Sequence, residues 1–151
     1  MSNRWCEMVE KFRTVFEKPC KHFEDMDEME LIRLRMGLIQ EESVETTDAL
    51  YELYKVHHAL STAQNDAKYF SECRKERKEA RIAVLDGICD SIFVLIGTAQ
   101  ALGMDIEKAM EAVFWSNMTK LGEDGKPIYR LSDGKVLKGP NFAPPDLEAF
   151  V

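Results

Sequence analysis

The sequence predicts an all-α protein, a four-helix bundle followed by a C-terminal tail that is irregular or forms a small hairpin. Helical periodicity runs through nearly all of the first 120 residues. The last 31 residues hold four of the eight glycines and four of the five prolines, a composition typical of turns. We therefore expect an all-α domain over residues 1–120 and a tail over residues 121–151 that packs on the same domain.

The first two helices are predicted from apolar spacing and from the residues that interrupt it. A helix over residues 3–16 has apolar side chains at spacings of three and four, and Pro19 ends it. A second helix is expected from residue 30 to residue 57 or beyond, because Gly37 is its only glycine and it contains no proline.

The third and fourth helices are separated from the second by a polar stretch at residues 61–68. The third has a highly charged entry from residue 72 and reaches residue 102. Gly103 suits a left-handed cap at its end. Asp105 can then cap a fourth helix, "DIEKAMEAVFWSNMTK".

The tail after residue 120 contains two Asp-Gly steps, at residues 124 and 133. This dipeptide is typical of tight turns between antiparallel strands. The segments "KPIYR" and "KVLKG" flank "LSDG", and we expect them to pair as a small hairpin.

Charge and cysteine content limit the protein class. The net charge of -7 and the pI of about 5.1 oppose binding to nucleic acid or to an anionic membrane. The four cysteines show no Cys-x-x-Cys spacing, which indicates free thiols in a reducing compartment. The longest apolar stretch, residues 88–101, is interrupted by Asp90 and is shorter than the roughly 20 residues that span a bilayer. No signal peptide is evident, so we expect a soluble cytoplasmic protein.

Three glutamates interrupt the apolar face of the second predicted helix. They are Glu41, Glu42 and Glu45. At helical spacing they continue the stripe that Leu31 and Leu38 begin, and therefore point toward the same side. Partly buried carboxylates repel one another and lose hydration, so they require protonation, a cation or a metal ion.

A second pair of acids, Asp86 and Asp90, lies on neighbouring turns of the third predicted helix. The segment around them is apolar nearly all round, and no lysine or arginine occurs between Arg81 and Lys108. Clustered carboxylate oxygens without histidine or cysteine select hard cations such as Mg²⁺ or Mn²⁺, which also bind phosphate. The sequence therefore predicts a divalent-cation site and a phosphate-containing substrate.

This order of acids resembles the all-α nucleoside triphosphate pyrophosphohydrolases, which include MazG-like proteins, dimeric dUTPases and phosphoribosyl-ATP pyrophosphohydrolase. Their motif is Glu-Glu-x-x-Glu followed by Glu-x-x-Asp, and "EESVE" matches its first part. Compact, often phage-borne MazG-like proteins are similar also in "RLRMGLIQEE", "CDSIFVLIGTAQALG", "SNMTK" and the tail "DGKVLKGPNFAPPDL". The resemblance covers most of the chain and implies a MazG-like bundle. The sequence differs from the family motif at one position. Asp90 matches the aspartate of Glu-x-x-Asp, but Gly87 stands where the motif has glutamate. Asp86, one position earlier, is a candidate substitute for that glutamate.

The resemblance implies hydrolysis of a nucleoside triphosphate between its α- and β-phosphates, which releases a nucleoside monophosphate and pyrophosphate. The implied metal ligands are Glu41, Glu42, Glu45, Asp86 and Asp90. They would hold Mg²⁺ or Mn²⁺, about one to three ions per site. Either Glu41 or Glu42 serves as general base in this interpretation. Phage relatives make dUTP and dGTP the leading substrates, and the host cytoplasm the location of a phage-encoded protein.

Further residues are predicted to bind the substrate. Asn117 and Lys120 match an Asn-x-x-Lys pattern of the family, and an amide and an ammonium suit a sugar or base edge and a phosphate. Weaker candidates are Lys135 and Lys138 in the tail and Arg35 near the glutamates. The family assembles as homodimers or homotetramers with sites near subunit interfaces, so we expect an oligomer.

Two other protein classes compete with the enzyme. A ferritin-like bundle also buries glutamates, but it uses Glu-x-x-His pairs, which this sequence lacks. A non-catalytic helical dimerisation or metal-binding module explains the apolar third helix without any chemistry. Binding of Mn²⁺, together with the effect of Glu42→Gln on nucleotide interactions, discriminates this module from the enzyme.

Overall fold

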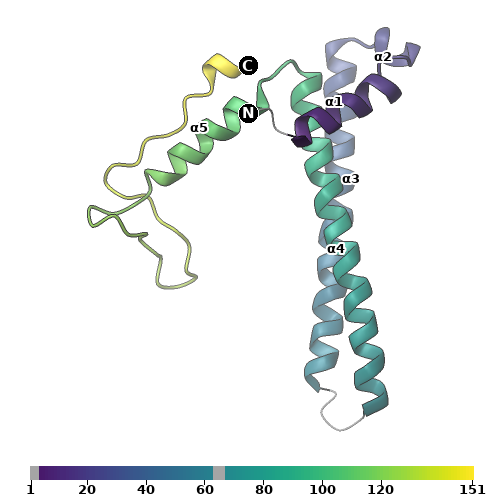
Figure 1. Cartoon of the computed structure of the whole chain (residues 1–151), viewed down its shortest axis with the longest axis vertical. Coiled ribbons are helices and arrows are strands. Elements are labelled where there is room, and N and C mark those ends of the chain that lie inside the picture. Colours follow the sequence, from purple (N-terminus) through teal and green to yellow (C-terminus); the bar gives the residue numbers. More distant parts are fainter. Residues whose placement is uncertain (1–3, 63–66) are drawn as a thin grey trace. The chain divides into compact units, whose positions relative to one another are not determined.

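The computed structural model describes residues 4–62 and 67–151, and helices dominate it (Figure 1). The elements are α1 (Arg4–Phe16), α2 (Lys21–Glu24), α3 (Glu28–Thr62), α4 (Ala67–Ala101), α5 (Ile106–Met118) and the 3-10 turn η1 (Glu148–Phe150). No β-strand occurs in the described part of the chain. The all-α prediction is confirmed. The short α2 was not predicted, because a single turn leaves no periodic pattern.

The chain divides into two compact units. One unit contains α1, α2, α3 and α4 up to Thr98, and the other is Ala99–Val151. The first unit holds the long helices, and the second holds α5 and the tail.

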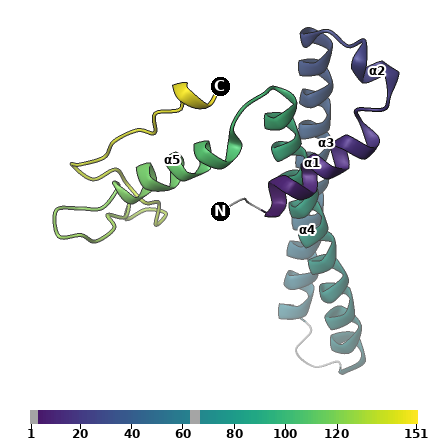
Figure 2. The ribbon, with the colours of Figure 1, turned by 45° about the horizontal axis from the view of Figure 1, so that its top comes forward.

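Helices α3 and α4 form a long antiparallel hairpin and lie side by side in both ribbon views (Figures 1 and 2). Each has 35 residues; α3 ends at Thr62, within the expectation of residue 57 or beyond, and α4 begins at Ala67, earlier than the predicted residue 72. The start of α3 is fixed by a reciprocal cap, in which the Glu30 amide donates to Asp27 Oδ1 at 2.8 Å and the Asp27 amide donates to Glu30 Oε2 at 3.2 Å. At the other end both helices extend into the predicted polar connection at residues 61–68, of which residues 63–66 lie outside the described part.

The two long helices approach each other closely at Gly87. A Cβ atom built there would lie 2.8 Å from Thr46 Oγ1 and 3.1 Å from Thr46 Cα. The hydroxyls of Thr46 and Ser91 are 3.0 Å apart at the same level and share a hydrogen bond. Only glycine permits this approach without a shift of the helices.

Helix α1 crosses the hairpin and is joined to it by an ion-paired junction. Glu17 Oε2, just after α1, accepts hydrogen bonds from Arg13 Nε at 2.8 Å and from Arg35 Nη2 of α3 at 2.7 Å. Arg35 is only 4% exposed. The ring of Phe12 packs edge-on against Phe93 of α4, with centroids 5.2 Å apart. Polar and apolar contacts together therefore fix α1 on the hairpin.

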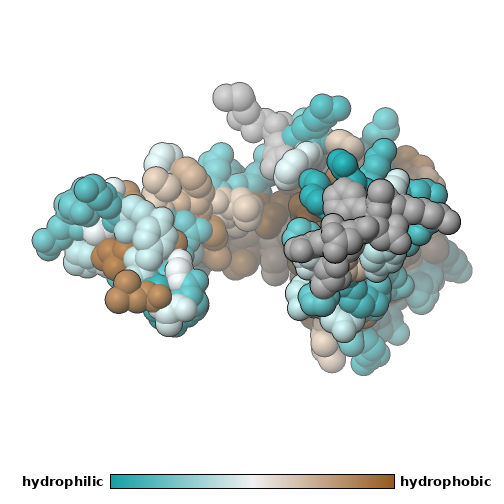
Figure 3. Space-filling model, turned by 90° about the horizontal axis from the view of Figure 1, so that it is seen from below, coloured by the Kyte–Doolittle hydropathy of each residue, from teal (hydrophilic) through white to brown (hydrophobic). Residues whose placement is uncertain are grey.

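Much of the apolar surface of α4 is exposed in the single chain. Leu85 is 62% exposed and Ile82 59% exposed, and hydrophobic residues lie at the molecular surface in Figure 3. By length and composition the segment Ser71–Ala101 is able to cross a membrane, since an 18-residue window has a mean hydropathy of 1.9, and only 17% of this window is buried. The expectation concerned the apolar stretch at residues 88–101, whereas the helix that contains it begins well before residue 88, at Ala67. Core helices of soluble proteins pass the same test, so this is weak evidence for a membrane.

The unit Ala99–Val151 is built on α5 and a tail that returns along it. Gly103 adopts a left-handed φ of 76°, and Asp105 Oδ1 accepts from the Lys108 amide at 3.1 Å, so both predicted caps are confirmed. The predicted hairpin also forms, as an isolated antiparallel bridge between Tyr129 and Val136. Further along, Ser116 Oγ donates to the carbonyl of Ala143 at 2.7 Å, which ties the tail to α5.

Candidate functional site

Four carboxylates act on a fifth, Glu42, on the α3–α4 hairpin. The pKa of Glu42 is raised, first by burial and then by the negative charges of its neighbours. In order of effect these are Asp90, Glu45, Glu41 and Asp86. Four of the predicted metal ligands therefore lie within electrostatic range of the fifth, Glu42; three of the five belong to α3 and two to α4. We call them the acidic cluster.

Burial differs sharply within the acidic cluster. Glu42 is half-buried, and its Oε2 atom is shielded from solvent with no hydrogen-bond partner in the described structure. The other four carboxylates are exposed. Partial burial was expected for all three glutamates, and the structure shows it for Glu42 alone, because the residue directly faces α4.

Small side chains hold the two halves of the acidic cluster together. Ser91 Oγ shares a hydrogen bond with Thr46 Oγ1 and also donates to the carbonyl oxygen of Glu42 at 3.5 Å. Gly87 lies against Thr46, so the position of the missing family glutamate is filled by the neighbouring helix. Sequence reasoning missed Thr46 and Ser91. Their signal was spacing, since Thr46 follows Glu42 and Ser91 follows Gly87 by one helical turn.

The donor chemistry of the acidic cluster fits a hard divalent cation. All of its donors are carboxylate oxygens, and Glu42 contributes a buried oxygen without a partner. In the described part of the chain no three acid, histidine or cysteine side chains converge closely enough to hold an ion as they stand. Because four of the five carboxylates are exposed, they are able to rotate toward an ion.

The predicted substrate-binding residues lie in different environments. Arg35 belongs to the hairpin unit, where its guanidinium is engaged with Glu17. The other four belong to the unit Ala99–Val151, and they are Asn117, Lys120, Lys135 and Lys138. Within that unit Asn117 lies in the last turn of α5, and its carbonyl accepts from the Lys120 amide at 3.2 Å. The ammonium of Lys138 is exposed and lies 4.2 Å from the centroid of the Phe142 ring.

Comparison with known proteins identifies the family. A family model described as phosphoribosyl-ATP pyrophosphohydrolase matches residues 9–117, well over half of the chain. The chain belongs to the phosphoribosyl-ATP pyrophosphohydrolase family. The matched region contains α3, α4 and the whole acidic cluster. The resemblance to the MazG-like superfamily of all-α pyrophosphohydrolases is thereby confirmed, and membership in the phosphoribosyl-ATP pyrophosphohydrolase family supports nucleotide pyrophosphohydrolase activity.

A solved structure is also similar to this chain. It is a "putative NTP pyrophosphohydrolase" from Exiguobacterium sp. 255-15, with 22% sequence identity, a TM-score of 0.46, and coverage of 99% of this chain and 94% of the other. No curated protein matches the chain. The family membership rests on the matched model alone.

Proposed function

We propose that this member of the phosphoribosyl-ATP pyrophosphohydrolase family is a metal-dependent nucleoside triphosphate pyrophosphohydrolase of the cytoplasmic nucleotide pool. It would cleave the bond between the α- and β-phosphates and release a nucleoside monophosphate and pyrophosphate. The observation that supports this most is the acidic cluster, in which Glu42 is surrounded by four further carboxylates without a cation of its own. Such a site favours an external divalent cation and a polyphosphate bound to it.

The acidic cluster would hold Mg²⁺ or Mn²⁺ through Glu41, Glu42, Glu45, Asp86 and Asp90. When bound, the ion neutralises phosphate charge and lowers the pKa of a coordinated water. Glu41 or Glu42 would accept the proton of the attacking water, since both belong to the cluster. The close approach of α3 and α4 at Gly87 keeps the two sets of carboxylates near each other.

Binding of the remaining substrate would fall to the polar residues at the end of α5 and in the tail. Lys120, Lys135 and Lys138 supply ammonium groups for phosphate, and Asn117 supplies an amide for the sugar or base. Arg35 ranks last, because it would reach a substrate only by leaving Glu17, to which it is bonded at 2.7 Å.

The nucleobase of the substrate is proposed from the family resemblance, and dUTP and dGTP are the leading candidate substrates. The matched family model is named for phosphoribosyl-ATP, which is a further candidate. The second function to test is a non-catalytic helical module that binds metal or dimerises. The exposed apolar surface of α4 favours it, because that surface needs a partner whether or not the protein is an enzyme.

The deciding experiment incubates the protein with dUTP, dGTP, dCTP and phosphoribosyl-ATP in Mg²⁺ or Mn²⁺. Monophosphate and pyrophosphate are followed separately. We expect both products from at least one substrate, and a loss of about a hundredfold or more in Glu42→Gln. Glu52→Gln is the matched control, because Glu52 is an exposed glutamate of the same helix outside the acidic cluster.

Two results would contradict the enzyme. Release of orthophosphate alone would show cleavage of a different bond. Absence of any product, together with no Mn²⁺ binding by calorimetry, would leave the helical module as the better description.

We also propose that a second copy of the chain covers the exposed apolar surface of α4 and α1. Trp5 is 59% exposed and Met8 53% exposed, and both line a cavity of 380 Å³ with Leu85, Ile88 and Ile92 of α4. A membrane is a poorer partner, because Asp86 and Asp90 lie within the same helix and charge is expensive in a bilayer. The mass measured by light scattering should then be that of a dimer or tetramer.

A further inference from the structure

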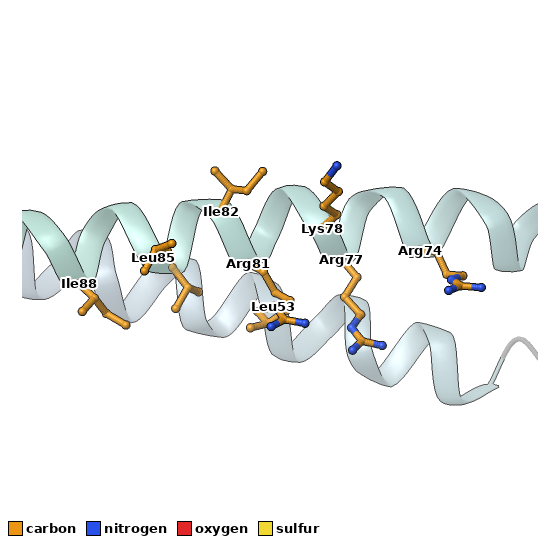
Figure 4. A pocket seen from close by; sticks show the side chains of 9 residues that line it. Leu53, Arg74, Arg77, Lys78, Arg81, Ile82, Leu85 and Ile88 are labelled. Atoms are coloured by element: carbon orange, nitrogen blue, oxygen red, sulfur yellow. The ribbon is translucent and has the colours of Figure 1, made fainter.

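A second charged region lies on the half of the α3–α4 hairpin near the helix ends at Thr62 and Ala67. It is an open cavity of 720 Å³. We call it the basic groove, and its lining includes Arg74, Arg77, Lys78 and Arg81 with Leu53, Ile82, Leu85 and Ile88. Figure 4 shows the guanidinium groups of Arg77 and Arg81 on the side of α4 that faces α3, beside Leu53 of α3. A smaller cavity of 470 Å³ shares Arg74 and Arg77 and extends the groove to His57.

The arginines Arg77 and Arg81 of the basic groove point toward α3, and Lys78 lies at the outer edge of the same part of α4 (Figure 4). Arg77 and Lys78 each lie three or four positions from Arg74 and from Arg81, so both are neighbours of those two arginines on the helix surface. The glutamates of the same segment, Glu72, Glu76 and Glu79, fall on the opposite side at helical spacing. Like charges at these spacings destabilise a helix, so the arrangement favours a bound anion.

Three of these cations have no ion-pair partner in the part of the chain that the structure describes. Among the described residues no salt bridge involves Arg77, Lys78 or Arg81, although Lys75 pairs with Glu79 at 3.8 Å on the other flank. All three side chains are exposed. In a chain with a net charge of -7, this cluster is a local feature of opposite sign. It attracts a small anion, whereas the overall charge opposes a long polyanion or an anionic membrane.

The shape and lining of the groove define the ligand further. Its volume is in the range of small-molecule sites. Planar guanidinium groups bind phosphate oxygens in pairs, and the adjacent leucine and isoleucine side chains offer an apolar surface for a base. Among the described residues that line the groove, the charged side chains are all basic, which suits binding of an anion without a divalent cation.

We propose that the basic groove is a second ligand site, at which a nucleoside polyphosphate binds without a divalent cation. Arg77 and Arg81 bind the phosphates, and the apolar wall at Leu53 of α3, which lies beside Arg81, contacts the nucleoside. This site is distinct from the acidic cluster, which needs a cation before it accepts a phosphate. It does not depend on the proposed hydrolysis.

The test removes the metal, so that only the basic groove binds. Calorimetry in EDTA at low salt measures dUTP and, separately, pyrophosphate. We expect one dUTP per chain for the wild type and for Glu42→Gln, and weaker binding of pyrophosphate, which lacks the nucleoside. The double variant Arg77→Ala/Arg81→Ala should lose about a hundredfold in affinity, because two charge-assisted contacts are removed.

The matched control is Lys55→Ala/Lys75→Ala, which removes the same charge from α3 and α4 outside the groove. Its affinity for dUTP should equal that of the wild type, and circular dichroism should show equal helicity for all variants. The proposal is overturned if the wild type binds no dUTP in EDTA, or if both double variants bind equally. It is also overturned if Arg77→Ala/Arg81→Ala changes only the mass of the assembly, since a second copy would then occupy the groove.

Failure of this site and failure of the proposed hydrolysis are distinguishable. Binding in EDTA without hydrolysis in Mg²⁺ would support the groove and contradict the enzyme. Hydrolysis in Mg²⁺ without binding in EDTA would support the enzyme and contradict the ligand site in the groove.

Discussion

The ion-paired junction of Arg13, Glu17 and Arg35 and the acidic cluster belong to the same unit, but they differ in whether a buried charge has a partner of opposite sign. At the junction Glu17 accepts from Arg13 and Arg35, so each charge has a partner within the chain. In the acidic cluster the charges that act on Glu42 are all negative, and its buried Oε2 atom has no hydrogen-bond partner in the described structure. Neutralised charge indicates a structural role, and charge left without a partner indicates a ligand of opposite sign.

The largest effect is expected where the junction is broken. Arg35→Ala leaves Glu17 partly buried with one cation fewer, and should lower the free energy of unfolding by about 3–5 kcal/mol. Lys18→Ala is the control, because Lys18 pairs with Glu10 on the surface at 2.7 Å and such pairs contribute about 1 kcal/mol or less. Urea denaturation measures both. Equal losses in the two variants would show that the junction is no different from a surface pair.

An intermediate effect is expected at Gly87, where packing and charge can be separated. Gly87→Ala adds a methyl group 2.8 Å from Thr46 Oγ1 and should destabilise the protein by about 1–3 kcal/mol. Gly37→Ala is the matched control, since Gly37 also lies within a long helix but a Cβ atom added there would meet no atom within 4 Å. That variant should stabilise the helix by roughly 0.5–1 kcal/mol. If both substitutions shifted the midpoint temperature of thermal unfolding in the same direction, the close approach of α3 and α4 would be contradicted.

The smallest effect is a pH dependence of the acidic cluster without metal. The pKa of Glu42 is raised in the folded protein, so the folded state holds this proton more tightly than the unfolded state. Stability then falls as the pH rises from the ordinary glutamate pKa through the raised value. Glu42→Gln removes this loss and should unfold at a higher temperature than the wild type at pH 7 in EDTA.

The difference should vanish at a pH below the ordinary glutamate pKa, where both states are protonated. Addition of Mn²⁺ at pH 7 should reverse the order, because the wild type gains a ligand that the variant binds poorly. Thermal melts across the pH range in EDTA and in Mn²⁺ measure both effects. A wild type that is more stable than Glu42→Gln in EDTA at pH 7 would contradict the repulsion among the carboxylates.

Local patterns in the sequence predicted much of this structure. The stripe containing Leu38 and Glu42 located the acidic cluster, and the Asp-Gly step at residue 133 located the hairpin, because both signals act over a few residues. The remainder depends on contacts between helices. The partner of Arg35 is Glu17, which lies in a different element, and Gly87 reads as an isolated helix glycine until Thr46 is seen against it. The basic groove likewise could not be predicted from the sequence of α4 alone, because Leu53 of α3 forms part of its lining.

Gly87 has a further consequence for local opening of the fold. Glycine is among the poorest helix formers, so α4 has one of its least favourable residues where it also has a tight contact with α3. Protection of the amides near residue 87 from hydrogen exchange therefore reports the docking of the two helices more than the helix itself. A ligand that draws the carboxylates of α3 and α4 together will slow exchange at this point first.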